Sequence, residues 1–236
     1  MEKRSPDTKS ISVIIPVYND RDSIIPTRKK LEETLKNIPW KHEIIFVDDG
    51  STDGAKELLS LHKINSISHD VNKGYGAAIK TGAEKCASDY FCIIDCDLTY
   101  PPEEIPRLLE YINDYDMVVG ARVSIEAPRL HRFGKWFVCG LLKKIFRQEV
   151  PDINSGLRIF RTKTFREYMP ALCDRFSLTA SITLGFLLAG RPIKYVPIKY
   201  NKRAGQSKVR NLSYIWSFVN SFIRMYRFCR RKRANS

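Results

Sequence analysis

Short apolar runs of strand length alternate with helix-like stretches along the first half of the chain. The runs are rich in Val, Ile and Phe and lie at 11–19, 42–50, 90–97 and 116–122. Continuous apolar runs of this length are typical of strands that are covered on both faces. Helical periodicity fills the intervals, at 21–37, 53–63, 74–87 and 102–114. This alternation predicts an α/β fold with a mostly parallel, doubly wound sheet flanked by helices.

The later part of the chain predicts two further strands with a helix between them. The strands are expected at 155–162 and 192–201. An antiparallel direction in the sheet is an alternative for each of them. The helix is the apolar stretch of 13 residues at 178–190. A membrane span requires roughly 18 to 20 apolar residues, so we expect this helix to be buried in the protein.

Polar side chains gather where the first four predicted strands end. In open sheets of this class, ligands bind beyond the carboxyl ends of the strands. Four strands therefore bring acids or a base to one edge, and we expect a binding site there. The residues are Tyr18, Asn19 and Asp20 after the first run, Asp48, Asp49 and Ser51 after the second, Asp95 and Asp97 after the third, and Arg122 after the fourth.

Asp95 and Asp97 form a pair that is separated only by Cys96. Alternate residues of an extended chain project the same way, so both carboxylates would face one side and Cys96 the other. Two like charges held this close repel each other unless a cation joins them. Mg²⁺ or Mn²⁺, held by one or two carboxylates and by phosphate oxygens, suits the pair. A solvated loop after a strand is the simpler interpretation of these three residues alone.

Two further motifs each allow a structural and a functional interpretation. The VDDGSTD motif at 47–53 predicts a strand, a tight turn and a helix capped by Ser51 or Thr52. Its two aspartates exceed what capping needs and suit hydrogen bonds to ribose hydroxyls or base edges. The glycine-rich helix start at 72–82 either cradles a phosphate or permits close helix packing.

The chain has 236 residues and a net charge of +14, which is concentrated at its C-terminal end. Residues 175–236 hold 14 of the 40 basic residues and none of the 26 acidic ones, so the preceding part is neutral. This asymmetry predicts an anionic partner, such as nucleic acid, lipid headgroups or a phosphorylated ligand. The length suits one domain. The six cysteines form no C-x-x-C pair and the N-terminus has no apolar signal segment, so we expect a reducing, cytosolic location.

Six motifs occur in an order and spacing that resemble family 2 of the glycosyltransferases, which has the Rossmann-like GT-A fold. They are SVIIPVYND, IFVDDGSTDG, NKGYGAAIKTG, DCDLTYPPE, GAR and DINSGLRIF. The later RAGQSK, at 203–208, is similar to the polyprenyl-phosphate branch, which includes dolichol-phosphate mannose and glucose synthases. The resemblance covers 11–210 and implies a catalytic domain at 11–208 after a flexible N-terminus at 1–10.

The resemblance implies roles on the donor side. Mg²⁺ or Mn²⁺ on Asp95 and Asp97 would hold the diphosphate of a nucleotide sugar. Some relatives have a Gln metal ligand where this chain has Thr99, so the resemblance is incomplete there. The resemblance also places Pro16, Tyr18 and Asp20 around the nucleobase, where Asp20 replaces a more usual Glu. The other implied donor contacts are Asp48 and Asp49 at the base or ribose, together with Lys73 and Gly74.

On the acceptor side the resemblance implies a lipid phosphate held by basic residues. A phosphate is already an anion at pH 7 and needs cations rather than a base, and the acid-free C-terminal quarter independently favours such an acceptor. The residues are Arg122, one of Arg129 and Arg132, and, on a loop that closes over donor and acceptor, Arg203 and Lys208.

We therefore expect a transferase that moves mannose or glucose from a GDP- or UDP-sugar to a polyprenyl or dolichyl phosphate, with inversion. Arg203 would act in catalysis with the metal-binding aspartates. A sugar or protein hydroxyl acceptor would instead require a general base, for which Asp152, and after it Asp174, is the candidate. A third hypothesis is an inactive membrane-binding scaffold, against which the intact pair of aspartates argues.

The segment 209–229 has helical periodicity with a wide aromatic face, and RRKR follows at 230–233. We expect 209–236 to lie on the cytosolic face of a membrane, where each base near an anionic surface contributes about 1 kcal/mol. It would do so alone or with a separate membrane subunit. A helix docked on the core is the alternative, and nucleic acid is disfavoured because no recognised module accompanies the charge. The apolar stripe is Leu212, Ile215, Trp216, Val219, Phe222, Ile223 and Tyr226.

Overall fold

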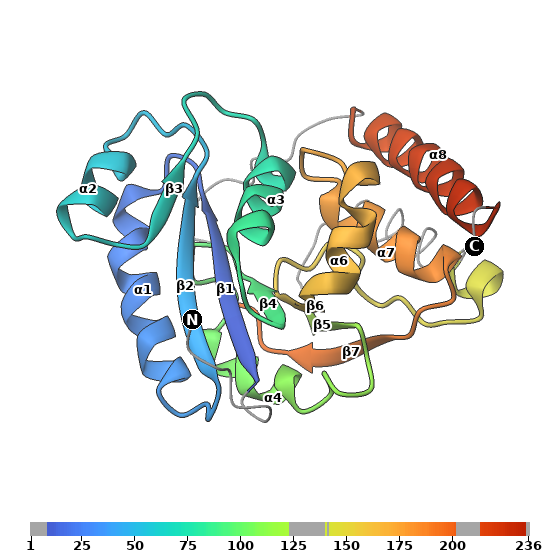
Figure 1. The fold of residues 1–236 in the computed structure, drawn as a ribbon, viewed down its shortest axis with the longest axis horizontal. Coiled ribbons are helices and arrows are strands. Elements are labelled where there is room, and N and C mark those ends of the chain that lie inside the picture. Colours follow the sequence, from blue (N-terminus) through green and yellow to red (C-terminus); the bar gives the residue numbers. More distant parts are fainter. Residues whose placement is uncertain (1–8, 123–139, 141, 202–212, 235–236) are drawn as a thin grey trace.

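A seven-stranded mixed sheet forms the centre of the molecule (Figure 1). The computed structural model describes residues 9–122, 140, 142–201 and 213–234, with the backbone alone for 213–218. The strand order is β3-β2-β1-β4-β6-β5-β7. The strands are β1 (Ser10–Val17), β2 (Lys41–Asp48), β3 (Ser66–Ser68), β4 (Tyr90–Ile93), β5 (Met117–Arg122), β6 (Arg158–Arg161) and β7 (Ile193–Ile198).

Strand directions confirm the expected mostly parallel sheet. β1 pairs in parallel with β2 and β4, and β5 pairs in parallel with β7. β6 is antiparallel to both of its neighbours, β4 and β5. The antiparallel alternative therefore holds for β6 and is wrong for β7. β3 was not predicted, because its three residues contain a single apolar side chain, Ile67.

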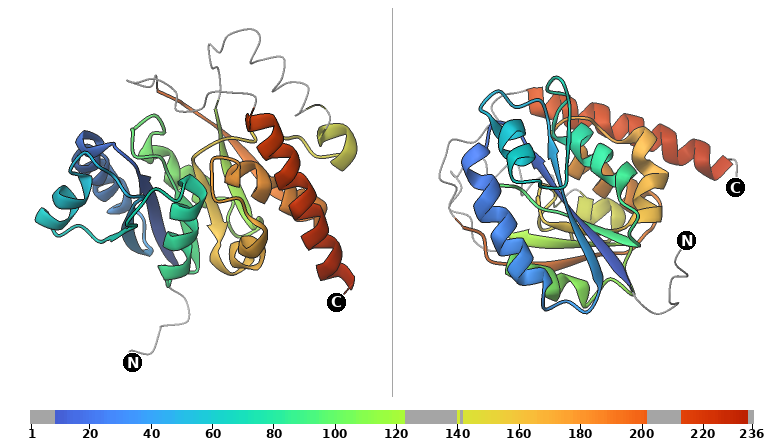
Figure 2. Two further views of the ribbon diagram at one scale, coloured as in Figure 1. Left: turned by 90° about the horizontal axis from the view of Figure 1, so that it is seen from above. Right: turned by 60° about the vertical axis from the view of Figure 1, so that its left-hand side comes forward.

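Helices cover both faces of the sheet (Figure 2). Ile14 of β1 packs in one core with α3, α6, α7 and α8, whereas its neighbours Val13 and Ile15 pack in another with α1, α2 and α4. Successive side chains of a strand point to opposite faces of the sheet. Because helices cover both faces of β1, its apolar run is continuous. The helices are α1 (Arg21–Leu35), α2 (Ala55–Leu61), α3 (Tyr75–Lys85), η1 (Pro102–Glu104), α4 (Ile105–Leu109), α6 (Thr162–Tyr168), η2 (Met169–Ala171), α7 (Leu178–Leu188) and α8 (Ser213–Ala234).

The last two helices pack against each other. All residues of α7 from Leu178 to Leu187 are buried, as expected for the apolar stretch. α8 contributes Ser221, Met225 and Cys229 to the buried interior, so this face of the helix is docked on the core. Within the described residues, no helix has both the length and the apolar content that crossing a membrane requires.

The apolar stripe predicted for α8 is not its docked face. Val219, Ile223 and Tyr226 are 40%, 42% and 49% exposed, respectively, while Phe222 is half-buried against the core. Leu212 lies outside the described residues, and the side chains of Ile215 and Trp216 are not described. α8 therefore has a docked face and a separate apolar row that the rest of the described chain does not cover.

α3 packs against β1 at a position where only glycine fits. A Cβ atom at Gly82 would lie 2.6 Å from Cγ2 of Ile14, which is itself fully buried. Ile14 cannot move away, because it is packed inside the sheet–helix core. The absence of a side chain at position 82 thus sets the distance between α3 and the sheet.

We predict that Gly82→Ala lowers the free energy of unfolding by about 1–3 kcal/mol, as overpacking of a core does. Gly140→Ala is the matched control, since a Cβ there would meet no atom of the described residues within 4 Å. Urea denaturation of both variants measures the difference. Equal midpoints for the two variants would show that α3 can shift to accept the methyl group.

Candidate active site

The candidate site lies where the strand order reverses. β2 and β3 lie on one side of β1, and β4 pairs with the other side of β1. Such a switch point leaves a crevice beyond the carboxyl ends of the strands. Val17 is in register with Asp48, and Arg158 at the start of β6 is in register with Ile93 near the end of β4. The segments after β1, β2 and β4 and before β6 therefore meet at one edge.

Asp48 is a buried carboxylate with one unsatisfied oxygen. Its side chain is fully buried, and Oδ1 accepts a hydrogen bond from Ser51 N at 3.1 Å. Oδ2 is buried and has no hydrogen-bond partner in the part of the chain that the structure describes. Leaving a buried acceptor unpaired costs about 1–3 kcal/mol, more for a charged group. Asp48 is thus suited to receive a donor group of a ligand, as expected for a ribose hydroxyl or a base N–H.

Asp49 differs from its neighbour because protein groups occupy both of its oxygens. Oδ1 lies 2.7 Å from Nδ1 of His69 and accepts from Lys73 N, and Oδ2 accepts from Gly74 N at 2.8 Å. The carboxylate is buried, whereas the Lys73 side chain is exposed. Asp49 therefore holds the 72–74 turn, and this geometry does not support a direct contact with the donor. His69 was missed because nothing in its sequence surroundings marks it.

Close packing explains the glycines at the start of α3. A Cβ at Gly74 or Gly76 would collide with the backbone of Cys173 and Asp174, and Ala77 N donates to the Asp174 carbonyl at 2.9 Å. Protein acceptors thus occupy the amides of Lys73, Gly74 and Ala77, three of those that the phosphate interpretation would use. Asp174, one of the two candidate bases, forms an exposed ion pair with Lys80.

The turn after β2 also corrects the predicted helix cap. Neither Ser51 nor Thr52 caps α2, which begins at Ala55 after Gly54. Thr52 N donates instead to Oδ1 of Asn19 at 2.8 Å, and Asn19 N donates to Ser51 Oγ at 3.0 Å. These bonds join the turns after β1 and β2 into one wall of the site.

The predicted nucleobase residues lie on that wall or beside it. Tyr18 is 39% exposed, and Pro16 is half-buried within β1. Asp20 is half-buried and its Oδ1 accepts from Ser23 Oγ at 2.9 Å, so it also orders the start of α1. Their contacts with a nucleobase remain predictions.

Asp95 rests on the segment before β6. A Cβ at Gly156 would lie 2.5 Å from Oδ2 of Asp95, so the carboxylate lies directly over that glycine. Tyr75 Oη donates to Asp95 Oδ1 at 3.0 Å. Burial, and then the charge of Asp95, raise the pKa of Tyr75 well above its ordinary value. The phenol therefore stays protonated and orients Asp95 as a hydrogen-bond donor.

Asp97 is oriented by Thr99. Oδ1 of Asp97 accepts from Thr99 N at 3.1 Å and from Thr99 Oγ1 at 2.6 Å. Thr99 is almost fully buried. Cys96 is buried between two half-buried aspartates, as the alternation predicted. Thr99, the position at which the resemblance is incomplete, thus holds the neighbouring carboxylate.

The donor set around these aspartates fits a hard divalent cation. Among the described residues, no group of three or more His, Cys, Asp or Glu side chains could hold a metal ion. Mg²⁺ is usually held by one or two carboxylates, with water and phosphate oxygens as the other ligands. Asp95 and Asp97 supply that number, so they would hold the ion together with a diphosphate.

Arg122 and Asp152 form a buried ion pair at the end of β5. Nε and Nη2 of Arg122 donate to the two oxygens of Asp152 at 2.6 and 2.8 Å. The Asp152 side chain is fully buried and that of Arg122 is 16% exposed. Burial alone would lower the pKa of Arg122, but the bonds to Asp152 raise it, so the guanidinium stays charged. Both oxygens of the predicted base therefore face a cation rather than an open acceptor position.

Arg158 is a buried cation that the sequence analysis did not identify. It is fully buried and donates to the Ser155 and Ile153 carbonyls and to Thr183 Oγ1 at 2.7–2.9 Å. Burial lowers its pKa. An arginine inside the apolar run at 155–162 is the signal that could have found it. The remaining predicted residues Arg129, Arg132, Arg203 and Lys208 lie outside the described residues.

Similarity to known proteins is found at the level of sequence and of structure. The chain is 31% identical over 206 residues to the undecaprenyl-phosphate 4-deoxy-4-formamido-L-arabinose transferase of Pseudomonas fluorescens (strain Pf0-1), covering 84% of this chain and 59% of that protein. The protein of the same name from Edwardsiella ictaluri (strain 93-146) is 30% identical, covering 84% and 62%. The chain thus spans between half and two thirds of the length of these relatives.

Glucosyl-3-phosphoglycerate synthase from Mycobacterium tuberculosis, solved with Mn²⁺, UDP-glucose and phosphoglyceric acid, is similar in structure, with a TM-score of 0.69. The alignment covers 94% of this chain and 80% of that chain at 17% identity, which shows a common GT-A fold. The model of the family described as glycosyl transferase family 2 matches residues 12–177. The ordered motifs, the sheet and these matches agree that the chain belongs to glycosyl transferase family 2.

Proposed function

We propose that this protein transfers a hexose from a nucleotide sugar to a polyprenyl phosphate, using Mg²⁺ or Mn²⁺. The observation that carries the proposal is the unpaired buried oxygen of Asp48, on the same sheet edge as Asp95 and Asp97. That edge offers a hydrogen-bond acceptor for a hydroxyl or base N–H of the nucleotide sugar. It also offers two carboxylates for a metal ion that is bound to the diphosphate. The names of the relatives, which are undecaprenyl-phosphate transferases, support the lipid acceptor.

The described residues divide between donor and acceptor. Asp48 would bind the nucleoside, and Tyr75 and Thr99 would hold Asp95 and Asp97 in place. The bound ion would stabilise the negative charge that develops on the departing nucleoside diphosphate. Arg122, kept charged by Asp152, would attract the acceptor phosphate. Because a phosphate nucleophile needs no deprotonation, the pairing of Asp152 with arginine suits this acceptor better than a hydroxyl acceptor.

A lipid acceptor would place the reaction at a membrane surface. The exposed row of Val219, Ile223 and Tyr226 supports this location, as does the basic end of α8. We propose a peripheral position on the cytosolic face, with a separate membrane subunit as a further possible partner. The donor is proposed as UDP- or GDP-linked mannose or glucose, and the formamido-arabinose sugar of the relatives belongs in the same test panel.

Incubation with each nucleotide sugar, Mn²⁺ or Mg²⁺, and undecaprenyl or dolichyl phosphate in detergent should yield a glycolipid. Mass spectrometry of the extracted lipid identifies the product, and chelation of the metal should abolish it. Glycosylation of a sugar or protein hydroxyl in the absence of any glycolipid would refute the lipid acceptor.

We predict that Asp97→Ala abolishes the metal-dependent rise in melting temperature that the cognate nucleotide sugar causes. Thr99→Val, which removes one of the bonds that orient Asp97, should weaken the metal-dependent binding about 10–100-fold. The matched control is Thr162→Val, because Thr162 is also buried but lies at the start of α6, beyond the end of β6 that is opposite the candidate site. Thermal shift titrations with Mn²⁺ measure all three. Unchanged binding in Asp97→Ala would favour the inactive-scaffold hypothesis.

We predict that Asp152→Asn destabilises the fold yet leaves transfer to the lipid phosphate within about 10-fold of the unmodified chain. Removing a partner of a buried ion pair costs about 3–5 kcal/mol, so the assay is run well below the melting temperature and normalised to folded protein. A general base would contribute about 100- to 10,000-fold to the rate. A loss of that size in kcat, with acceptor KM unchanged, would restore the hydroxyl-acceptor hypothesis.

A further inference from the structure

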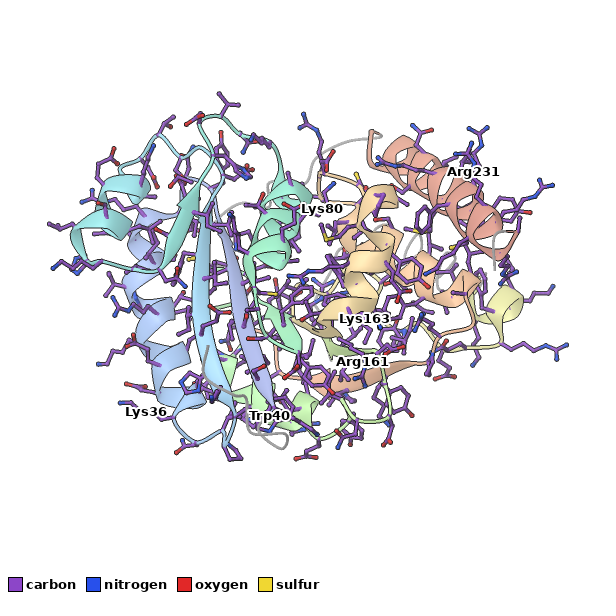
Figure 3. All side chains as sticks on the ribbon, viewed as in Figure 1. Lys36, Trp40, Lys80, Arg161, Lys163 and Arg231 are labelled. Carbon is purple, nitrogen blue, oxygen red and sulfur yellow. The ribbon has the colours of Figure 1, made fainter. Side chains whose placement is uncertain are left out.

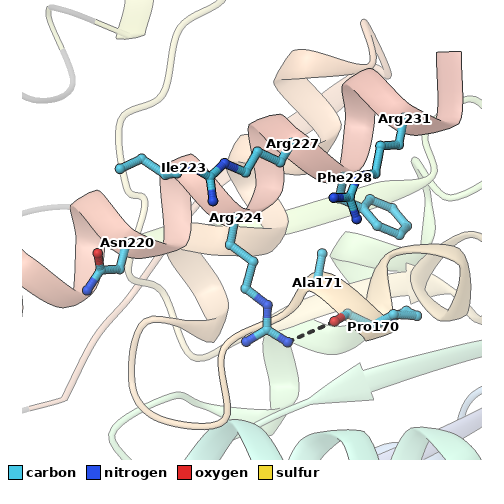
Figure 4. A pocket seen from close by; sticks show the side chains of 8 residues that line it. All are labelled: Pro170, Ala171, Asn220, Ile223, Arg224, Arg227, Phe228 and Arg231. Atoms are coloured by element: carbon cyan, nitrogen blue, oxygen red, sulfur yellow. Dashed lines mark hydrogen bonds between the residues drawn. The ribbon is translucent and has the colours of Figure 1, made fainter. Parts of the chain in front are cut away.

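A groove of about 450 Å³ lies between α8 and η2, on the part of the molecule remote from α1 and α2 (Figures 1 and 4). Its floor is formed by Pro170 and Ala171 of η2, which follows α6 directly. Asn220 and Ile223 line it from α8. It is separate from the candidate site at the strand ends, since no residue assigned to donor or acceptor lines it.

Three arginines of α8 give the groove its charge. Arg224, Arg227 and Arg231 all line it and all are exposed. Arg224 reaches across to donate to the Pro170 carbonyl at 2.8 Å, as Figure 4 shows. Among the described residues, none of the three has a carboxylate within ion-pair distance. The nearby acid Glu167 pairs with Arg191 and Lys232. The three guanidinium groups therefore lack a counter-charge from the described protein.

The groove borders the exposed apolar row of the same helix. Ile223 belongs to both, and Val219 and Tyr226 lie beside it one helical turn away on either side. A helix with an apolar row flanked by arginines matches a membrane interface, where acyl chains meet phosphate groups. Arginine binds phosphate oxygens through two parallel hydrogen bonds, which a row of guanidinium groups at helical spacing can supply.

We propose that this groove binds the phosphate headgroup of an anionic phospholipid and thereby seats α8 in the plane of a membrane. The inference deepens the proposed function, on which it rests for the membrane location, by assigning a second phosphate site that takes no part in transfer. Its ligand is a bulk lipid of the bilayer rather than the acceptor. The apolar row would contact acyl chains while the arginines contact headgroups.

The test is flotation of the full chain with vesicles, without donor or acceptor. The unmodified protein should bind equimolar phosphatidylcholine–phosphatidylglycerol vesicles and bind pure phosphatidylcholine vesicles much less. Arg227→Gln with Arg231→Gln should lower the partition constant about 30-fold, since each base near an anionic surface contributes about 1 kcal/mol. The control pair, Lys29→Gln with Lys36→Gln, removes the same charge from an exposed position of α1 and from its exposed C-cap, and Figure 3 places Lys36 far from Arg231.

A second variant tests the groove itself while preserving the arginines. Asn220→Asp keeps the size of an exposed lining residue and adds a negative charge, so it should weaken vesicle binding in a folded protein with an unchanged melting temperature. Soluble dihexanoyl phosphatidylglycerol should bind the unmodified chain and not the arginine double variant. Equal losses in the arginine and lysine pairs, or self-association through α8 without vesicle binding, would overturn the proposal.

A failure of this site would be distinguishable from a failure of the proposed function. If both proposals hold, Arg227→Gln with Arg231→Gln should lose vesicle binding and keep glycolipid synthesis in detergent. Vesicle binding unaffected by Arg227→Gln with Arg231→Gln and by Asn220→Asp would refute the groove and leave transfer untouched. Vesicle binding by a chain that forms no glycolipid would refute the transfer and leave the groove standing.

Discussion

The buried guanidinium of Arg158 holds the edge of the sheet where the candidate site lies. It stands at the start of β6, between β4 and β5, and binds the carbonyls of Ile153 and Ser155 together with a hydroxyl of α7. A charge removed from water is costly unless its hydrogen bonds are satisfied, so this position strongly favours one conformation of the segment before β6. That segment carries Asp152, which pairs with Arg122, and Gly156, on which Asp95 rests. The residues proposed for the acceptor side and for the donor side thus depend on the same buried cation.

Much of the fold could be predicted because the determining signals are local. A strand covered on both faces is recognisable from its own residues, and the aspartates and Arg122 at the strand ends are adjacent to those runs in sequence. Asp95 and Asp97 were found in the same way, because they follow the apolar run of β4 directly in sequence, and their binding of a metal stays a prediction. The three-residue strand β3 carried too little apolar sequence to be recognised.

What could not be predicted depends on contacts between distant segments. Asp48 and Asp49 are equivalent in sequence, yet one has an unpaired oxygen and the other binds His69 and the turn at 72–74. The glycines at the start of α3 fit a phosphate or another segment equally well until the backbone of Cys173 and Asp174 is found against them. The docked face of α8 was also unpredictable, because the helix is apolar on two sides and only the packing of Met225 and Cys229 decides between them.

That packing makes α8 part of the same core that supports the sheet. Met225 and Cys229 belong to one continuous cluster with Ile14 of β1 and Phe91 of β4. Swinging α8 away from the core would expose these buried side chains to water, so their packing favours one angle between the helix and the sheet. With α8 on a membrane, the core rather than a flexible linker would set the distance from the strand ends to that membrane. The proposed lipid phosphate would then reach Arg122 at a constant depth.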